Sequence, residues 1–256
     1  MIPEYTERSF YVQCNDSSER DLIFPSALTG DFQEVAEDAV VTYGVDTNSL
    51  NEAGFCWIIL KMSVEMDRFP AWKETFKVRT WSCGCEKLCW RRDYSVIDEA
   101  GNEIGRGTSE WLVADMKTHR PIRPKSVIDA FDGVDDFDKL LLPQNDREAM
   151  KEPSPKLDFP ENMEVLGEPV ISKFADYSEL DHNHHVNNTR YVAWAFDVLY
   201  KIGCDVYSVK GFDINYHAEV KAGEKVDIYH LEKDGIDHIY GYSDGSKKVF
   251  VVRCRR

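Results

Sequence analysis

The chain has 256 residues and a formal net charge of −15, and these properties exclude several classes of protein. Its length suits one large domain or two of ordinary size, and 43% hydrophobic residues indicate a folded core and not a disordered chain. The acidic balance argues against nucleic-acid binding, which needs a basic surface. We find no apolar run of membrane-spanning length and no secretory signal. Seven cysteines without framework spacing predict a cytoplasmic protein with reduced thiols.

The first half of the chain is predicted to contain one helix followed by antiparallel strands. Residues 5–13 favour a strand, and residues 31–40 favour a helix that buries Phe32, Val35, Ala36 and Ala39. Further strands are predicted at residues 54–66, 74–82, 88–97 and 104–115, with a Pro70 turn and a hairpin loop between them. We assign residues 1–120 to one structural repeat.

Seven of the ten prolines lie between residues 121 and 169, which predicts a linker at 121–164 with one short helix or turn around 127–142. A second repeat, 165–256, follows. It begins with a strand at 165–172 and a helix from about Thr189 to Gly203. Strands are then predicted at 207–220, 225–232, 236–242 and 247–253. Each half is therefore a strand, a helix and a meander that can wrap the helix, which predicts an α+β double hotdog.

A polar segment, Asp-His-Asn-His-His-Val-Asn-Asn, begins at Asp181 and precedes the second helix. If it is extended, Asp181, Asn183 and His185 share a face. They supply a carboxylate, an amide and an imidazole, enough for acid–base chemistry with a neutral hydrogen-bond donor. Asn187 and Asn188 are good N-caps, and the first backbone amides of the helix can stabilise an oxyanion.

Simpler interpretations of these residues remain open. Asn and His before a helix often serve only as turn and cap residues. Three histidines, 182, 184 and 185, could bind a metal, but no second cluster at ligand spacing accompanies them, so we expect no metal. The cysteines at 83, 85 and 89 lack a fourth ligand nearby and favour free, buried or half-buried thiols.

Residues 181–194, of the form Asp-x-Asn-x-His-Val-Asn-Asn-x-x-Tyr-x-x-Trp, resemble the active-site segment of the acyl-ACP thioesterases, which release fatty acids from acyl carrier protein. The resemblance, to the bacterial type, covers nearly the whole chain. It includes residues 62–66, 69–72, 80–81, 91–94 and 105–111. It implies a double hotdog without a cofactor, with catalytic groups in the C-terminal repeat. The N-terminal repeat would shape the acyl pocket, where we expect Trp72 to contact substrate.

Carried over residue by residue, the resemblance assigns catalytic roles to Asp181, Asn183, His185 and Glu219. The plant enzymes have a cysteine after this glutamate, but this chain has Val220, which excludes an acyl-cysteine there. We expect one-step hydrolysis in which Glu219 activates a water and His185 binds that water or protonates the leaving sulfur, although the two roles can be exchanged. Asn183 and the helix amides would polarise the thioester, and Asp181 would orient Asn183 and His185. Without the resemblance, Glu219 is an ordinary exposed strand carboxylate.

The expected partner is an acyl carrier protein that carries a fatty acyl-phosphopantetheine. Carrier proteins are acidic, so docking on this acidic chain requires a local basic patch. The candidate patch, which is equally a solvated start of the linker, comprises Lys117, His119, Arg120, Arg123 and Lys125, with Arg91 and Arg92 nearby in sequence. We expect Asn187, Asn188, Arg120, Arg123 and Lys125 to contact the substrate, and a monomer or homodimer. An acyl-CoA thioesterase and a non-hydrolytic acyl-thioester sensor remain alternatives. The four polar residues with assigned catalytic roles argue against the sensor, because buried polar groups are costly unless they are used or satisfied.

Overall fold

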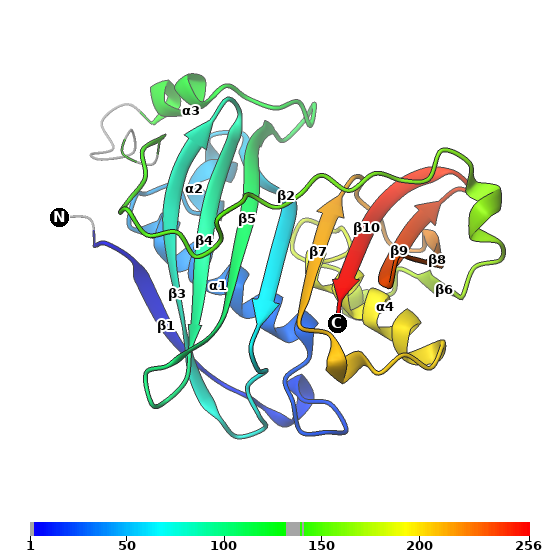
Figure 1. Ribbon diagram of the computed structural model, residues 1–256. Coiled ribbons are helices and arrows are strands. Elements are labelled where there is room, and N and C mark those ends of the chain that lie inside the picture. Colours follow the sequence, from blue (N-terminus) through cyan, green and yellow to red (C-terminus); the bar gives the residue numbers. More distant parts are fainter. Residues whose placement is uncertain (1–2, 132–138, 140) are drawn as a thin grey trace. The chain divides into compact units, whose positions relative to one another are not determined.

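The computed structural model describes residues 3–131, 139 and 141–256, and the chain forms two compact units. The first comprises residues up to 23 together with 28–154, and the second comprises 24–27 and 155–256. Each unit is an antiparallel sheet with one long helix against it (Figure 1). The chain therefore has the predicted double hotdog fold. The finer division at residues 120 and 164 remains a prediction.

The described part of the first unit contains a five-stranded sheet in the order β1–β3–β4–β5–β2. Its strands are β1 (Thr6–Tyr11), β2 (Phe55–Met66), β3 (Thr75–Glu86), β4 (Cys89–Ile97) and β5 (Glu103–Asp115). The long helix α1 (Pro25–Val41) packs on this sheet, because Phe32 stacks on Tyr94 of β4 with ring centroids 4.5 Å apart. The ring also covers Gly107 of β5, where a Cβ would lie 2.5 Å from it. The absence of a side chain there lets the helix approach the sheet closely.

The helices of the first unit differ from the prediction at their ends. The buried stripe of α1 is confirmed, but the helix begins six residues earlier, at Pro25, a residue that suits the first turn. A short helix, α2 (Thr47–Glu52), was not predicted, although Asp46 caps it by accepting from two backbone amides. The helix expected around 127–142 is described only as α3 (Pro124–Ala130). Residues 132–138 and 140 of that prediction lie outside the described residues.

The second unit, as far as it is described, contains a five-stranded sheet in the order β7–β10–β9–β8–β6. Its strands are β6 (Ile171–Phe174), β7 (Gly211–Tyr216), β8 (Lys225–Lys233), β9 (Ile236–Ser243) and β10 (Lys247–Arg255). Helix α4 (Asn188–Lys201) contacts β8 and β10, and its Tyr191 ring lies 5.2 Å from Phe250. The two Asp-Gly turns are confirmed, since Asp234 and Asp244 have positive φ before their glycines.

Two strand predictions in the second unit are partly wrong. Residues 165–172 contain a 3-10 helix, Met163–Leu166, and the strand begins only at Ile171, because Pro169 cannot donate a ladder hydrogen bond. Residues 207–220 contain a 3-10 turn, Val206–Ser208, and β7 ends at Tyr216. The next two backbone amides both donate to the carbonyl of Val249. This irregularity ends the regular pairing three residues before Glu219.

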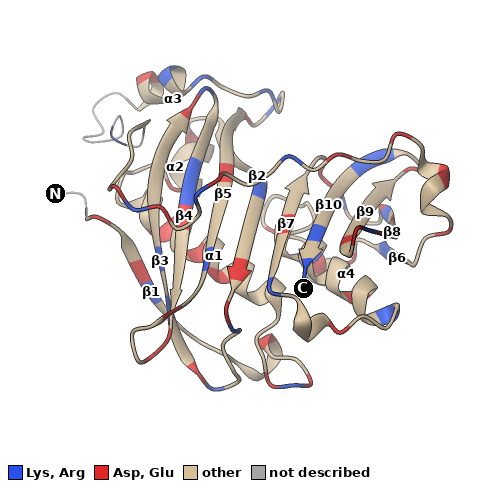
Figure 2. Cartoon of the chain, in the orientation of Figure 1, with Lys and Arg blue, Asp and Glu red and all other residues tan. Residues whose placement is uncertain are grey.

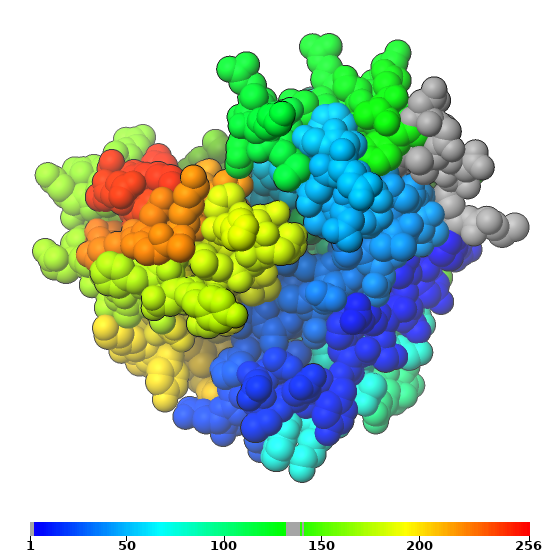
Figure 3. Space-filling view, turned by 180° about the vertical axis from the view of Figure 1, so that it is seen from behind, coloured from blue at the N-terminus to red at the C-terminus, as the bar shows by residue number. Residues whose placement is uncertain are grey.

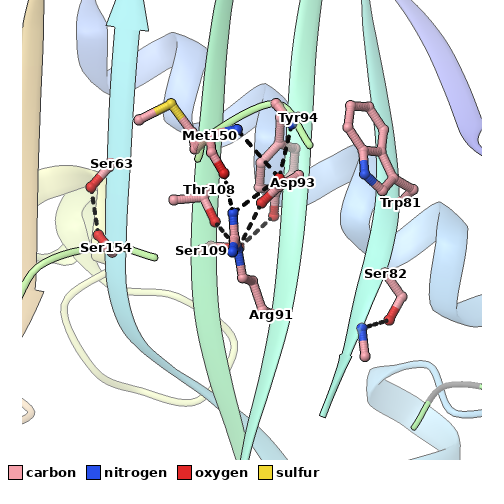
Figure 4. Close-up of polar contacts among 12 residues, drawn as sticks. Ser63, Trp81, Ser82, Arg91, Asp93, Tyr94, Thr108, Ser109, Met150 and Ser154 are labelled. Carbon is pink, nitrogen blue, oxygen red and sulfur yellow. Dashed lines mark hydrogen bonds and ion pairs between the residues drawn. The ribbon is translucent and has the colours of Figure 1, made fainter. Parts of the chain in front are cut away.

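The linker is held against the outer sheet face, opposite the helix, within each unit. In the first unit, the Asp93 carboxylate accepts hydrogen bonds from the amides of Ala149 and Met150 at 3.0 and 3.4 Å, and Arg91 donates to the Met150 carbonyl (Figure 4). In the second unit, the Asn215 side chain accepts from the Leu157 amide at 2.7 Å and donates to the Pro155 carbonyl at 2.9 Å. Buried polar side chains on both sheets therefore fix the path of this segment.

Candidate active site

The polar segment that begins at Asp181 forms a tight turn, so the conditional prediction of an extended segment is wrong. The Asp181 amide donates to the His185 carbonyl at 2.8 Å, and the His184 amide donates to the Asp181 carbonyl at 3.0 Å. The Asp181 carboxylate accepts from the backbone amides of Asn183 at 2.8 Å and His185 at 3.4 Å. A short Asp side chain that binds nearby amides favours a turn over a strand. A strand pleat therefore does not set the direction of these side chains.

His185 and Glu219 are the two predicted catalytic residues that the structure brings together. The Val186 amide donates to the Val220 carbonyl at 2.9 Å, and this pairing joins the turn to the segment after β7. The His185 Nε2 atom then lies 3.5 Å from the Glu219 Oε2 atom, with side-chain exposures of 19% and 42%. An imidazole beside a carboxylate that solvent reaches can bind and activate a water molecule.

Asp181 and Asn183 occupy the same turn but make different contacts from those expected. The Asp181 carboxylate binds the backbone of Asn183 and His185, where we expected it to bind their side chains. The Asn183 side chain is exposed and has no hydrogen-bond partner among the described residues. It is available to a ligand, and its catalytic role remains a prediction.

The first turn of α4 has one open backbone amide next to the polar turn. The Asn187 side chain is the N-cap and accepts from the amide and hydroxyl of Thr189 at 2.9 and 2.8 Å. The Thr189 amide is therefore occupied, whereas the Asn188 amide has no acceptor within the described part of the chain. An open amide at the electropositive end of a helix can donate to an oxyanion. Capping by Asn187 is confirmed, and the helix starts at Asn188, one residue before the predicted start.

Glu179 positions the site, although the sequence analysis missed it. Its carbonyl accepts from the Asn187 amide and its carboxylate accepts from the Trp194 indole N–H, both at 2.9 Å. The carboxylate also accepts from the amide of Asp176 in a capping box around the 3-10 helix Tyr177–Glu179. The Asp-x-x-Glu spacing could have revealed this role.

Lys247 and Tyr191 also border the site without having been predicted there. The Lys247 ammonium donates to the Glu219 carbonyl at 3.0 Å and lies 3.8 Å from the Glu224 carboxylate. Burial raises the pKa of Tyr191 well above its ordinary value, and the charges of Glu219 and Asp181 raise it further. Tyr191 therefore stays protonated near neutral pH.

The remaining predicted substrate contacts belong to the first unit. Trp72 is 39% exposed, and the ammonium of Lys73 lies 4.1 Å from the centroid of its ring. The loop before α3 and the start of this helix carry three exposed basic residues, Arg120, Arg123 and Lys125. This segment is drawn in green at the surface in Figure 3, and Lys and Arg are blue in Figure 2. None of the three has an ion-pair partner among the described residues. Their contact with substrate remains a prediction.

Two arginines near this basic segment in sequence do not belong to an exposed patch. Arg91 forms an ion pair at 3.1 Å with Asp93, whose side chain is fully buried. Arg92 is only 7% exposed and lies inside the first unit. Strand alternation places the two arginines on opposite faces of β4, so neither contributes to the exposed loop.

The described residues contain no group of three or more His, Cys, Asp or Glu side chains placed to hold a metal ion. Cys83, Cys85 and Cys89 are half-buried free thiols, as predicted. Burial raises the pKa of Cys83 to about 12 and that of Cys85 to about 11, so both are protonated at neutral pH. Within the described range, no helix has the length and apolar character needed to cross a membrane.

Two family models match the chain. The acyl-ACP thioesterase N-terminal domain matches residues 3–130, and the acyl-ACP thioesterase C-terminal domain matches residues 169–251. The chain belongs to the acyl-ACP thioesterase family. Oleoyl-acyl carrier protein thioesterase 2 of Arabidopsis thaliana, a chloroplastic protein, is 28% identical over 213 residues, which are 76% of this chain and 54% of that relative. This chain thus spans about half the length of that curated relative.

Two solved structures share the fold along nearly their whole length. An acyl-ACP thioesterase from Bacteroides thetaiotaomicron has a TM-score of 0.79 and 22% identity, covering 98% of this chain and 97% of that one. A 12:0-ACP thioesterase from Umbellularia californica has a TM-score of 0.80 and 19% identity, covering 100% and 98%. At these identities the likeness establishes the double hotdog fold alone.

Proposed function

We propose that this protein hydrolyses the thioester of fatty acyl-acyl carrier protein, which releases the free fatty acid and terminates fatty acid synthesis. The observation that carries the proposal is the contact of His185 with Glu219, 3.5 Å apart, beside the start of α4 in a chain of the acyl-ACP thioesterase family. The names of its relatives, which are thioesterases for acyl carrier protein substrates, support the substrate class.

The reaction requires a water molecule and no cofactor. The Glu219 carboxylate takes a proton from the water, whose oxygen attacks the thioester carbonyl carbon. The carbon–sulfur bond then breaks, and His185 gives a proton to the departing pantetheine sulfur. The same geometry allows His185 to act as the base and Glu219 to hold its ring, so the two roles can be exchanged. Val220 offers no thiol for a covalent intermediate.

The polar turn and the helix start would stabilise the transition state. The Asn188 amide and the Asn183 side-chain amide are donors without protein partners among the described residues, and both suit a developing oxyanion. Asp181 would hold the turn that presents Asn183 and His185. We assign the acyl chain to the interior of the N-terminal repeat, with Trp72 as a further contact. We assign the carrier protein to the basic loop that contains Arg120, Arg123 and Lys125.

The experiment is thiol release from matched series of acyl-acyl carrier proteins and acyl-CoAs of increasing chain length. We expect turnover of the carrier-protein substrates and a preferred chain length. Tight binding without thiol release would make the protein a sensor. A clear preference for the CoA esters would contradict the assignment of the basic loop to carrier-protein docking.

A further inference from the structure

The inner face of the first repeat carries a buried arginine. Tyr94 of β4 stacks on Phe32 of α1, so this side of the strand faces the helix. Arg92 precedes Tyr94 by two residues and therefore lies on the same face. It is 7% exposed. Its guanidinium group is thus enclosed between the sheet and the helical layer.

This guanidinium group has almost no protein partner. Its one hydrogen bond is from Nη1 to the Thr80 hydroxyl at 3.3 Å, and no carboxylate of a described residue pairs with it. The titratable groups around it are Tyr94, Tyr43 and Cys83. Burial raises the pKa of Tyr94 and of Cys83 to about 12, and it raises the pKa of Tyr43 above its ordinary value. All three neighbours are neutral near pH 7, whereas a guanidinium group remains charged.

A second donor on the same face is also unsatisfied. Trp90 lies two residues before Arg92 and packs in one cluster with Tyr43 of the segment after α1. Its indole N–H is buried and has no hydrogen-bond partner within the described part of the chain. Two neighbouring inward positions of β4 therefore present N–H donors without acceptors.

Hydroxyl groups surround this part of the interior. The register places Ser82 of β3 and Ser109 of β5 directly opposite Arg92. The Ser109 hydroxyl lies 2.9 Å from the Tyr94 hydroxyl (Figure 4). It also accepts a hydrogen bond from the Trp111 indole at 2.7 Å. These side chains provide a polar lining but no negative charge.

An enclosed charge without a counter-ion is costly, and so is a buried donor without an acceptor. A saturated hydrocarbon chain cannot satisfy either group. A ligand oxygen can, and a carboxylate can accept two parallel hydrogen bonds from one guanidinium group.

We propose that the interior of the first repeat binds the far end of an acyl chain that carries a hydrogen-bond-accepting oxygen, and that Arg92 selects for it. The oxygen belongs to a hydroxyl, keto or carboxylate group, and the carboxylate pairs most strongly. This inference rests on the proposed function, because it identifies the interior of the first repeat as the acyl site. Arg92 would determine specificity and would take no part in the hydrolysis.

The test compares binding of a saturated monocarboxylic acid with that of the α,ω-dicarboxylic acid of equal length, by calorimetry on the full chain. We expect the diacid to bind about tenfold more tightly or better. Arg92→Met keeps an unbranched side chain as far as the position of Nε, removes the rest of the guanidinium group and should abolish the preference. The matched control is Arg106→Met, which alters an exposed arginine of the neighbouring strand β5. This variant should keep the preference for the diacid. Equal affinity of the wild type for the two acids, or tighter binding of the monoacid, would overturn the proposal.

A stability measurement separates selection from a structural role. Because Met removes a buried charge without a counter-ion, Arg92→Met should melt at the wild-type temperature or above. A large drop in melting temperature together with an unchanged diacid preference would show that Arg92 serves the fold and would overturn the proposal. If this variant does not fold, the wild-type comparison decides, and Trp90→Phe, which removes the indole N–H together with one ring of the indole but keeps an aromatic side chain, should weaken the preference.

Hydrolysis assays distinguish failure of this inference from failure of the proposed function. A preference for the diacid without thiol release from any acyl-acyl carrier protein would contradict the hydrolase function. It would still support a site in the first repeat that binds the polar end of a chain. Hydrolysis of plain acyl chains with a kcat/KM ten times that of ω-carboxy chains would support the hydrolase function. It would contradict selection of a polar chain end by Arg92.

Discussion

The two repeats share one plan, but their inner faces differ in chemistry. In the first repeat, the strands present hydroxyl and guanidinium groups toward the helical layer: Thr80, Ser82, Arg92, Tyr94 and Ser109. In the second repeat, the corresponding face carries five fully buried apolar side chains: Phe212, Ile214, Ile239, Phe250 and Val252. Its buried charge, Asp237, is paired with His230 and Arg256, whereas Arg92 in the first repeat has no counter-ion among the described residues. The second interior therefore supports rigid packing, which holds the start of α4 and the turn at Asp181. The first interior contains N–H donors on Trp90 and Arg92 that lack acceptors among the described residues, and these suit a ligand.

The outer faces are more alike. Each repeat places a buried polar side chain, Asp93 in the first and Asn215 in the second, so that it binds linker backbone. The repeats thus differ mainly in their inner faces, and the inner face of the first repeat is the one that would receive the acyl chain. Four predictions test it, in order of decreasing expected effect.

The largest effect is expected from the apolar interior. Phe250→Ala removes a ring that is fully buried and packed against Tyr191, and it should lower the free energy of unfolding by about 3–5 kcal/mol. Ser109→Ala, in the polar interior, should cost only about 1–2 kcal/mol. Urea unfolding of both variants measures the difference. Equal losses would mean that the first interior is as rigid a core as the second.

The linker contacts should rank next. Asp93→Ala leaves Arg91 without its ion-pair partner and two linker amides without an acceptor, and it should cost about 3 kcal/mol. Asn215→Ala removes only neutral hydrogen bonds and should cost about 2 kcal/mol. Chemical denaturation gives both values, and limited proteolysis at residues 143–159 gives a local readout. A linker that stays resistant in both variants would contradict this account of its attachment.

Asp31 should make the first repeat sensitive to pH. Burial, helped by the nearby charge of Asp16, raises the pKa of this α1 carboxyl to about 7. A carboxyl whose pKa is higher in the folded state favours the protonated form there, so stability should fall as pH rises from about 4 to 7. Asp31→Asn should remove this slope and raise stability at pH 8 by about 1–2 kcal/mol, after allowance for partial exposure.

The measurement for Asp31 is the melting temperature across that pH range. Asp129→Asn, on the exposed surface of α3, controls for the change in net charge. A slope that persists in Asp31→Asn would assign the pH dependence to another group.

The smallest effect is expected at the basic loop of the first repeat. The double variant Arg120→Glu/Arg123→Glu should raise KM for acyl-acyl carrier protein by about three- to tenfold at low salt, and the effect should fade as salt rises. The KM for acyl-CoA and the kcat should not change. Lys87→Glu, in the exposed turn between β3 and β4, is the matched control. An equal effect from Lys87→Glu would assign the change to net charge.

The sequence predicted features that depend on local chemistry. The Asp-Gly turns, the Asn187 cap and the buried stripe of α1 each follow from backbone preference or from helical spacing. Element order was therefore sufficient for the double hotdog fold.

Features that depend on distant contacts could not be predicted. The pairing of His185 with Glu219 requires β7 to end early, which happens because two amides share the Val249 carbonyl. The turn at Asp181 arises because its carboxylate binds nearby amides. Nothing local distinguishes buried Arg92 from an exposed arginine, the more common case.

The most direct test of the account is thiol release from acyl-acyl carrier protein by the wild type, His185→Ala and Glu219→Ala. His182→Ala, an exposed residue of the same turn, serves as the control. We predict that both active-site variants lose about 100-fold or more in kcat with little change in KM, and that the control keeps wild-type activity. Wild-type kcat in Glu219→Ala or in His185→Ala would contradict the claim that this pair performs the hydrolysis.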